Sequence, residues 1–249
     1  MERPLIEGCV DSYASARAAA SAGADRLELC ANLMIGGTIP SPALFKQVQR
    51  DFDVKINVLI RPRFGDFLYT EPEMEEMCTE IRAFRSLGAN GVVIGSLTPD
   101  GRLDEEKMRR LADCAGDMEL TLPRAFDMTC DPGDALEAAI RLGCRTVLTS
   151  GQAPSALAGR EILRAMRTQA AGRIDIMAGC GVKSENIREI YGCTGILAYH
   201  TSGRVPRSSG MIYRKSGVSM GLPSLSEYEV WRTDPEEFRA CAEIVHGLL

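Results

Sequence analysis

Short apolar runs alternate along the chain with longer stretches in which apolar residues recur every three or four positions. Short runs bounded by turn residues are typical of buried strands, and the longer spacing is typical of amphipathic helices. One helical face is traced by Met74, Met77, Cys78, Ile81 and Phe84. The pattern predicts strands over residues 5–10, 26–30, 54–60, 91–95, 119–122, 146–149, 174–178 and 195–199, with helices between them.

Glycine marks the ends of four predicted helices, at Gly23, Gly88, Gly143 and Gly192, and a predicted strand follows each within a few residues. Glycine tolerates the left-handed backbone conformation that closes a helix. Three helix starts carry the complementary signal, a capping side chain before a proline: Ser41-Pro42, Asp131-Pro132 and Asp234-Pro235. A recurring helix–turn–strand joint is typical of a parallel α/β fold.

Eight strand–helix units in 249 residues predict a single-domain (β/α)8 TIM barrel that spans residues 1–249. A doubly wound open sheet is the alternative fold. The last helix, over about 235–249, would close the ring against the first strand. In either fold the chemistry belongs where the strands end, so polar residues at strand ends are the first candidates for a functional site.

Residues 201–233 do not follow the alternation of strands and helices, because they are rich in glycine, serine, arginine and proline and show no convincing helical pattern. A loop of this length is usually functional or disordered. Since it follows the eighth strand, we expect it to lie over the C-terminal mouth of the barrel. It is either a lid whose basic side chains attract an anion, or a surface or oligomer-contact loop. The basic residues are Arg204, Arg207, Arg214 and Lys215.

Composition narrows the class of protein. The net charge of −5 and the pI near 5.3 argue against nucleic acid or an anionic membrane as the main partner. No apolar run approaches the roughly 20 residues of a membrane span, and the first residues lead almost directly into a strand, leaving no room for a signal peptide. Nine cysteines without a C-x-x-C pair favour reduced thiols, so we expect a cytoplasmic protein. Only two histidines are present, which counts against a histidine-rich zinc or iron site.

Charged residues and a histidine fall on or just after several predicted strands. A buried charge must be paired, so one hypothesis is an ion-pair network in which carboxylates face arginines and fill the polar end of the barrel. The other hypothesis is a pocket in which the arginines bind an anionic group while a carboxylate or the histidine moves protons. The residues concerned are Glu7, Glu28, Arg61, Arg124, Asp127 and His200.

A candidate phosphate site is the glycine-rich stretch 178–182 after the seventh strand, together with Ser150 at the end of the sixth. Backbone amides around Gly179 and Gly181 could cradle a phosphate, as barrels often do near strands seven and eight. Tight turns between a strand and a helix need glycine in any case, so the stretch also has an explanation without a ligand.

A pair of cysteines suggests a metal site. Cys9 and Cys30 lie at the same height on neighbouring strands if the register of these strands is aligned. Two thiolates a few ångströms apart form a soft site that suits Cu(I). Free cysteine also packs as a small hydrophobe, so core filling is the alternative.

Nearly the whole chain resembles the CutC family, barrel proteins named for copper homeostasis. The segments that carry the resemblance are 7–12 (EGCVDS), 23–30 (GADRLELC), 36–41 (GGTIPS), 60–63 (IRPR), 65–67 (GDF), 124–127 (RAFD) and 148–151 (LTSG). The resemblance implies a TIM barrel, a cytoplasmic location, a homo-oligomer (dimer or larger) and a role in copper binding or tolerance. It also implies that Cys9 and Cys30 are the Cu(I) ligands.

Two positions depart from the family pattern. Pro123 stands where the family usually has a histidine before Arg124, and Ala198 stands where it usually has a glutamate two residues before His200. We expect both positions to face the barrel mouth, so this chain lacks one acid, base or ligand on each of two strands. Either the pocket binds something different, or an ancestral reaction has been altered.

The resemblance therefore favours a cytoplasmic copper-binding protein that uses its two thiols. The alternative is a barrel enzyme that acts on a small anionic metabolite, such as a phosphorylated one, at the C-terminal mouth. In that enzyme Arg61 and Arg124 would clamp the anion. Glu28, Asp127 or His200 would serve as acid or base. A third interpretation is a structural or interaction protein whose barrel mouth is inert.

Overall fold

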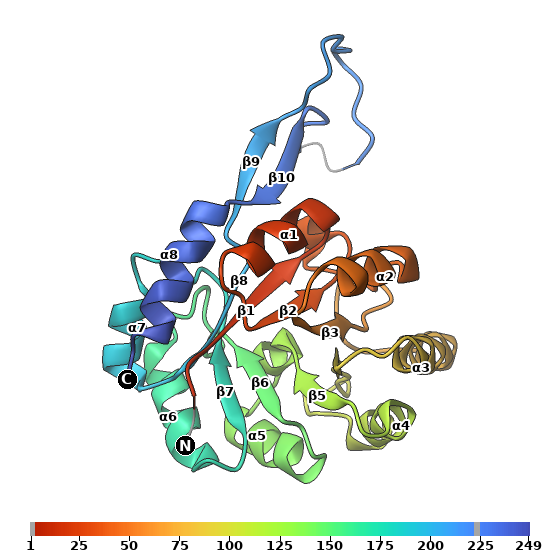
Figure 1. The fold of residues 1–249 in the computed structure, drawn as a ribbon. Coiled ribbons are helices and arrows are strands. Elements are labelled where there is room, and N and C mark those ends of the chain that lie inside the picture. The colour runs from red at the N-terminus through yellow and green to blue at the C-terminus, as the bar shows by residue number, and fades with distance from the viewer. Residues whose placement is uncertain (1–2, 222–224) are drawn as a thin grey trace.

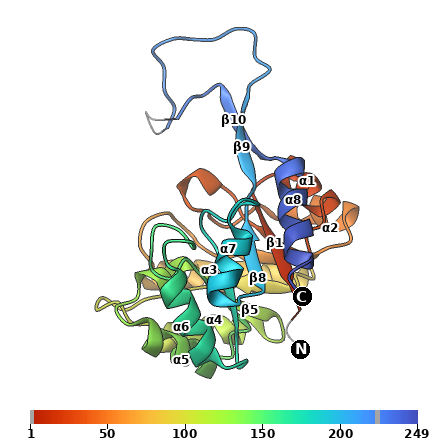
Figure 2. The ribbon, with the colours of Figure 1, turned by 90° about the vertical axis from the view of Figure 1, so that its left-hand side faces the viewer.

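The computed structural model describes residues 3–221 and 225–249, which form a closed barrel of eight parallel strands and an antiparallel pair outside it. Each barrel strand pairs with the next one in sequence, and β8 pairs with β1, so the ring closes. The helices surround the barrel on its outside (Figures 1 and 2). This is the predicted (β/α)8 TIM barrel, and the open sheet is excluded because the barrel has no unpaired edge.

In the described residues the barrel strands are β1 (Leu5–Val10), β2 (Arg26–Leu29), β3 (Lys55–Leu59), β4 (Gly91–Val93), β5 (Glu119–Leu122), β6 (Thr146–Thr149), β7 (Asp175–Ala178) and β8 (Ala198–Thr201). The helices there are α1 (Tyr13–Ser21), α2 (Pro42–Asp51), α3 (Glu71–Ser86), α4 (Glu105–Ala115), α5 (Pro132–Arg141), α6 (Arg160–Ala170), α7 (Ile187–Thr194) and α8 (Pro235–His246). Short 3-10 helices, η1 (Leu33–Ile35) and η2 (Arg124–Met128), follow β2 and β5. None of the described helices is both long and apolar enough to cross a membrane.

Local chemistry sets most of the helix boundaries as predicted. The side chains of Ser41, Asp131 and Asp234 accept hydrogen bonds from first-turn amides of α2, α5 and α8, and a proline follows each cap. Positive φ angles occur as predicted just after three helices, at Gly23, Gly88 and Gly143. These helix ends fix the short turns that connect each helix to the next strand of the barrel.

Seven predicted strands agree with the observed ones to within two residues at each end. The prediction for the eighth, 195–199, is wrong at its start, because β8 begins at Ala198 and includes His200. Helix α7 continues through Gly192, and Gly195 takes the left-handed conformation that closes it, with φ of 67°. The two glycines lie three positions apart, and the later one ends the helix.

Strand side chains divide into two layers. Outward-facing residues such as Ile6, Leu27 and Val58 pack with the helices in a large apolar core. A much smaller apolar cluster is formed by inward-facing residues: Cys9, Cys30, Leu59 and Val93. The rest of the barrel interior near β1, β2 and β8 is polar, and this is where the candidate site lies.

The long segment after β8 is present as predicted, but it does not form a lid over the mouth. Its ends form β9 (Arg204–Ser208) and β10 (Glu229–Thr233), which pair antiparallel. Figures 1 and 2 show that this pair and the residues beyond it project away from the barrel. We call residues 204–221 and 225–233 the arm.

The basic residues of the arm are engaged locally. Arg204 and Arg214 stack on aromatic rings of the arm itself. Arg207 lies 3.5 Å from Asp234, at the start of α8. The prediction that an anion gathers over the mouth is wrong for Arg214 and Lys215, because they belong to the segment beyond β9, which projects away from the barrel. For Arg204, whose Nη1 also lies 3.2 Å from Met34 Sδ in η1, it stays a prediction.

Candidate functional site

Polar side chains of β8, β1 and β2 meet inside the barrel. The strand register aligns Glu7 with His200 on β8 and with Arg26 on β2. Two residues further along, Cys9 is aligned with Glu28. Residues two positions apart on a strand share a face, so all five side chains point into the barrel.

Glu7 is the centre of a buried ion network. Its carboxylate accepts a hydrogen bond from Arg26 Nε at 2.5 Å and lies 2.7 Å from His200 Nδ1. Burial alone would raise the pKa of Glu7, but the charges and hydrogen bonds of Arg26 and His200 outweigh it and lower the pKa to about 2. Glu7 is therefore ionised at neutral pH, and it fixes the orientation of the imidazole ring.

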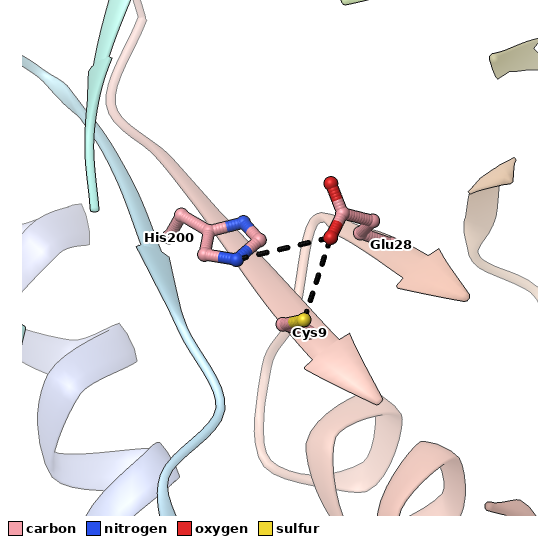
Figure 3. A group of neighbouring side chains, drawn as sticks. All are labelled: Cys9, Glu28 and His200. Atoms are coloured by element: carbon pink, nitrogen blue, oxygen red, sulfur yellow. Dashed lines mark hydrogen bonds and ion pairs between the residues drawn. The ribbon is translucent and has the colours of Figure 1, made fainter. Parts of the chain in front are cut away.

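The other ring nitrogen of His200 faces a cluster of potential metal ligands. His200 Nε2 lies 4.0 Å from Glu28 Oε1, and Cys9 Sγ lies 3.4 Å from the same oxygen (Figure 3). Ligand atoms of the three residues all lie within 4.8 Å of one another. We call Cys9, Glu28 and His200 the ligand group.

Burial and charge raise the pKa of every member of the ligand group. The neighbouring Cys30 thiol, followed by burial, raises the pKa of Cys9 well above its usual value. Burial raises the pKa of Glu28. Burial disfavours the charge on His200, but the Glu28 and Glu7 carboxylates favour it, and the pKa of His200 is raised well above its usual range. At neutral pH the site therefore holds a neutral thiol and an imidazolium.

Several buried polar atoms inside the barrel make no hydrogen bond within the described protein. They include Glu28 Oε2, both amide atoms of Asn57 and the hydroxyl of Thr121. Asn57 is aligned with Glu28 in the register of β2 and β3, and the absent side chain of Gly91 leaves room for its amide. Such unpartnered atoms cost about 1–3 kcal/mol each. This side of the barrel interior therefore suits a charged or polar ligand.

Cys30 lies further along the barrel than Cys9, so the expectation of equal height is wrong. The register aligns Cys9 with Glu28, and Cys30 follows the end of β2. The two thiols are nevertheless neighbours, because Cys30 is the largest influence on the pKa of Cys9 and both belong to the small apolar cluster inside the barrel. Cys30 therefore lies next to the ligand group on its apolar side.

Arg61 pairs with no carboxylate in the described part of the chain, so the ion-pair hypothesis is wrong for this residue. Its Nη1 donates to the Gly37 carbonyl at 3.2 Å and its Nη2 to the Gly65 carbonyl at 2.6 Å. The guanidinium also lies over the ring of Phe67. Arg61 thus joins the loops that follow β2 and β3, and its role as an anion clamp stays a prediction.

Arg124 and Asp127 form a separate cluster with Ser150. Arg124 Nε lies 2.8 Å from Asp127 Oδ2, and its Nη2 donates to the Ser150 hydroxyl at 3.2 Å. Asp127 also accepts hydrogen bonds from the Thr149 hydroxyl and from the Ser150 and Gln152 amides. A carboxylate engaged in this way holds η2 against the end of β6. Among the described residues, no hydrogen bond or ion pair links this cluster to the ligand group.

The glycine-rich turn after β7 has a packing role. Gly179 donates its amide to the Thr149 carbonyl at 3.0 Å, so that amide is not available to a phosphate. A Cβ on Gly179 would clash with Leu148 Cδ1 and would lie 3.5 Å from His200 Cβ. The phosphate cradle is therefore wrong for Gly179. For Gly181, whose φ is 72°, it stays a prediction.

Comparison with known proteins assigns the family. The model of the CutC family matches residues 4–205. A CutC family protein of Porphyromonas gingivalis is 44% identical over 244 residues, which cover 98% of both chains. The copper homeostasis protein cutC homolog of Homo sapiens is 42% identical over 246 residues, which cover 98% of this chain and 90% of the human one. The chain belongs to the CutC family.

A solved structure agrees with this assignment. The crystal structure of a CutC protein from Streptococcus agalactiae is 29% identical and superposes with a TM-score of 0.77. The match covers 80% of this chain and 98% of the other. The predicted membership of the CutC family and the predicted TIM barrel are both confirmed.

The two departures from the CutC pattern lie in different places. Ala198 begins β8, is aligned with Leu5 and lines a cavity of about 660 Å³ at the N-terminal opening of the barrel. The expectation that it faces the C-terminal mouth is therefore wrong. Pro123 caps η2 at the carboxyl end of β5, and its ring would contact a Cβ on Gly95 at 3.2 Å. Ala198, in place of the glutamate of the family, therefore changes the N-terminal opening of the barrel. Pro123 lies at the other end, the C-terminal opening.

Arg26 is the main site residue that sequence reasoning missed in this CutC chain. It starts β2, its side chain is 6% exposed, and it also lies 3.7 Å from Glu119 at the N-terminal opening. The available signal was its spacing of two from Glu28, which places both charges on the inward face. Asn57 carried the same signal on β3. Its lack of a partner is visible only in the structure.

Proposed function

We propose that this chain binds Cu(I) as its cargo, with the Cys9 thiolate as the central ligand and Cys30 and His200 as the neighbouring donors. The observation that carries the proposal is the convergence of ligand atoms from Cys9, Glu28 and His200 within 4.8 Å inside the barrel. Thiolate and imidazole are donors that suit copper, and Cu(I) in particular prefers soft sulfur ligands. The human relative is named a copper homeostasis protein, which supports the same assignment.

The surroundings of the ligand group also suit a bound cation. Glu28 Oε2 is buried and has no hydrogen-bond partner in the described protein. Glu7 holds Nδ1 of His200, which leaves Nε2 directed to the ligand group. A cation there would offset the negative charge that Glu7 and Glu28 bring into the barrel.

Binding must displace protons, because the pKa of Cys9 and that of His200 are both raised. The ligating forms are the thiolate and the neutral imidazole, so metal binding releases protons. Glu28 Oε1, at 3.4 Å from Cys9 Sγ, is placed to accept the thiol proton.

That all nine cysteines are free supports our proposal of a reducing, cytoplasmic location.

The test is a Cu(I) titration of the reduced protein against a competing chelator. We expect Cys9→Ser to weaken binding by at least about tenfold, in the range seen when metal sites lose an important group. Cys144→Ser is the matched control, because Cys144 is also a buried free cysteine but packs in the outer core. If Cys9→Ser binds as tightly as the parent, or if Cys144→Ser is equally weakened, the proposal is wrong.

A second candidate function is acid–base catalysis on a small anionic metabolite. The observation that favours it is the pairing of an imidazolium, oriented by Glu7, with Glu28, a carboxyl group whose pKa is raised. Arg61 and Arg124 are not placed at this pair, so an anion would meet His200 rather than an arginine clamp.

A thermal-shift screen of anionic metabolites distinguishes the two functions. A saturable rise in melting temperature that Glu28→Gln abolishes and Cys9→Ser preserves would favour the enzyme. A flat response across the metabolites, together with Cu(I) binding that depends on Cys9, would favour the copper protein.

A further inference from the structure

A second pair of cysteines lies outside the barrel, between two neighbouring helices. Cys78 is on α3 and Cys114 is on α4, and these helices pack side by side in the outer layer (Figure 1). Both residues are buried, at 3% and 6% exposed, and both belong to the large apolar core. Neither belongs to the ligand group, so the barrel site proposed above does not use them.

Contacts at two places fix how α3 and α4 align. Both helices follow parallel strands of the barrel, so they run in the same direction. Near the start of the interface, Arg110 Nη1 on α4 lies 2.6 Å from Glu71 Oε2 on α3. Near its end, Arg85 Nε on α3 lies 3.8 Å from Asp117 Oδ1, just after α4.

This alignment places the two cysteines opposite each other. Cys78 lies seven positions from each of the two α3 residues that make these contacts. Cys114 lies four positions after the first contact residue of α4 and three before the second. The electrostatics agree with this placement, because burial and then the Cys78 thiol are the two largest causes that raise the pKa of Cys114. The two thiols are therefore neighbours in the middle of the interface.

The pair is approached from the surface and is flanked by positive charge. A surface pocket of about 540 Å³ is lined by Cys114, and arginines outnumber carboxylates in its lining by four to two. Arg82 and Arg110 act against the rise in the pKa of Cys114. Glu71, and more weakly Cys78, raise the pKa of Arg110, so this guanidinium lies beside both thiols. Guanidinium groups in these positions would stabilise a negatively charged complex formed by the two sulfurs.

The number of donors limits which metal could bind. Among the described residues, the ligand group is the one set of three or more cysteine, histidine or carboxylate ligand atoms that converge, so the pair between α3 and α4 has no third ligand of these types. Zinc in structural sites takes four ligands. Soft thiolates select Cu(I), and a site with two of them suits an ion that accepts few ligands.

We propose that Cys78 and Cys114 form a second Cu(I) site, on the outside of the barrel between α3 and α4. On binding, both thiols release their protons, two Cu–S bonds form and the copper stays Cu(I). The product is a bis-thiolate complex with one negative charge, which Arg82 and Arg110 offset. The proposal rests on the proposed function only for the identity of the cargo, because the two sites share no residue and each can exist without the other.

An anaerobic Cu(I) titration of the reduced protein against a competing chelator tests the proposal. We expect the parent to bind two Cu(I) ions per chain. Cys114→Ala should weaken the outer site by at least about tenfold and keep the barrel site, whereas Cys9→Ser should keep the outer site. Cys144→Ser and Cys130→Ser are the controls, because they remove a buried and an exposed thiol, and both should bind like the parent.

X-ray absorption at the copper edge gives an independent measurement. Cys9→Ser loaded with one equivalent of Cu(I) should show two sulfur neighbours around the copper and no nitrogen or oxygen neighbour. Cys78→Ala should behave like Cys114→Ala, and circular dichroism should show that both variants keep the secondary structure of the parent.

Three results would overturn the outer site: a folded Cys9→Ser protein that binds no Cu(I), a Cys114→Ala protein that binds as many ions as the parent, or nitrogen or oxygen neighbours in the absorption spectrum. A pair that binds no Cu(I) but forms a disulfide with hydrogen peroxide would assign the two thiols to redox chemistry instead. Failure of the barrel site has a different signature, since the parent would then bind one ion that Cys114→Ala loses and Cys9→Ser keeps.

Discussion

Replacement of Glu7 by glutamine removes the central charge of the buried ion network and keeps the size of the side chain. The ordinary pKa of the group is 4.5, and in the folded protein it is about 2. At about 1.4 kcal/mol per pKa unit, the carboxylate contributes about 3 kcal/mol to the free energy of unfolding at neutral pH. The variant also leaves the buried Arg26 guanidinium without its closest partner, which typically costs about 3–5 kcal/mol.

The pH dependence of this loss has a definite sign. Because the folded-state pKa of Glu7 lies below the unfolded value, its stabilisation is complete above about pH 4.5 and is lost as the pH falls toward about 2. The difference in stability between the parent and Glu7→Gln should therefore be constant near neutral pH and should shrink in acid.

Urea denaturation at pH 7 and at lower pH measures this difference, and thermal denaturation should show a melting temperature lower by roughly 6–12 °C. Glu119→Gln is the control, because Glu119 faces the same Arg26 at 3.7 Å but its side chain is 38% exposed. We expect that control to cost less than about 1 kcal/mol. Equal losses in the two variants, or a Glu7→Gln loss that does not diminish in acid, would refute the ion-network interpretation.

Two further predictions concern packing and metal binding. Gly91→Ala should destabilise the fold by about 1–3 kcal/mol, because a Cβ there would lie 2.7 Å from the Glu119 carbonyl oxygen and 2.6 Å from Asn57 Oδ1. Gly192→Ala should instead be neutral or stabilising by about 0.5–1 kcal/mol, because Gly192 lies within α7 and a Cβ there would meet open space. Similar melting temperatures for Gly91→Ala and Gly192→Ala would contradict this prediction. The Cu(I) affinity should rise by at least about tenfold per pH unit between about pH 6 and pH 8, because the raised pKa values of Cys9 and His200 keep both groups protonated until the metal displaces their protons, and each displaced proton adds about a factor of ten per pH unit. A pH-independent affinity in a chelator competition would exclude thiolate binding.

Much of the fold could be predicted because its determinants are local. The caps at Ser41 and Asp131, the closing glycines and the apolar runs each act over a few residues. Both caps, three of the four closing glycines and seven of the eight apolar runs appear in the structure where they were expected. The start of β8 was wrong for the same reason, since Gly192 and Gly195 offer the same signal and only the packing of α7 selects the later one. The prediction of a lid over the mouth was wrong because the sequence of residues 201–233 contains no signal for the direction in which the arm leaves the barrel.

The sequence by itself determined the strand–helix order, the closed barrel that this order implies, and the polar residues that point inward from β1, β2 and β8. Which of these residues meet was decided by the tertiary structure, because strand register and barrel closure set distances between residues far apart in the chain. Register aligned Cys9 with Glu28 rather than with Cys30, and closure brought His200 to Glu7, 193 positions away. The protonation of the site followed from these contacts, since the pKa of a buried group depends on neighbours that only the folded chain supplies.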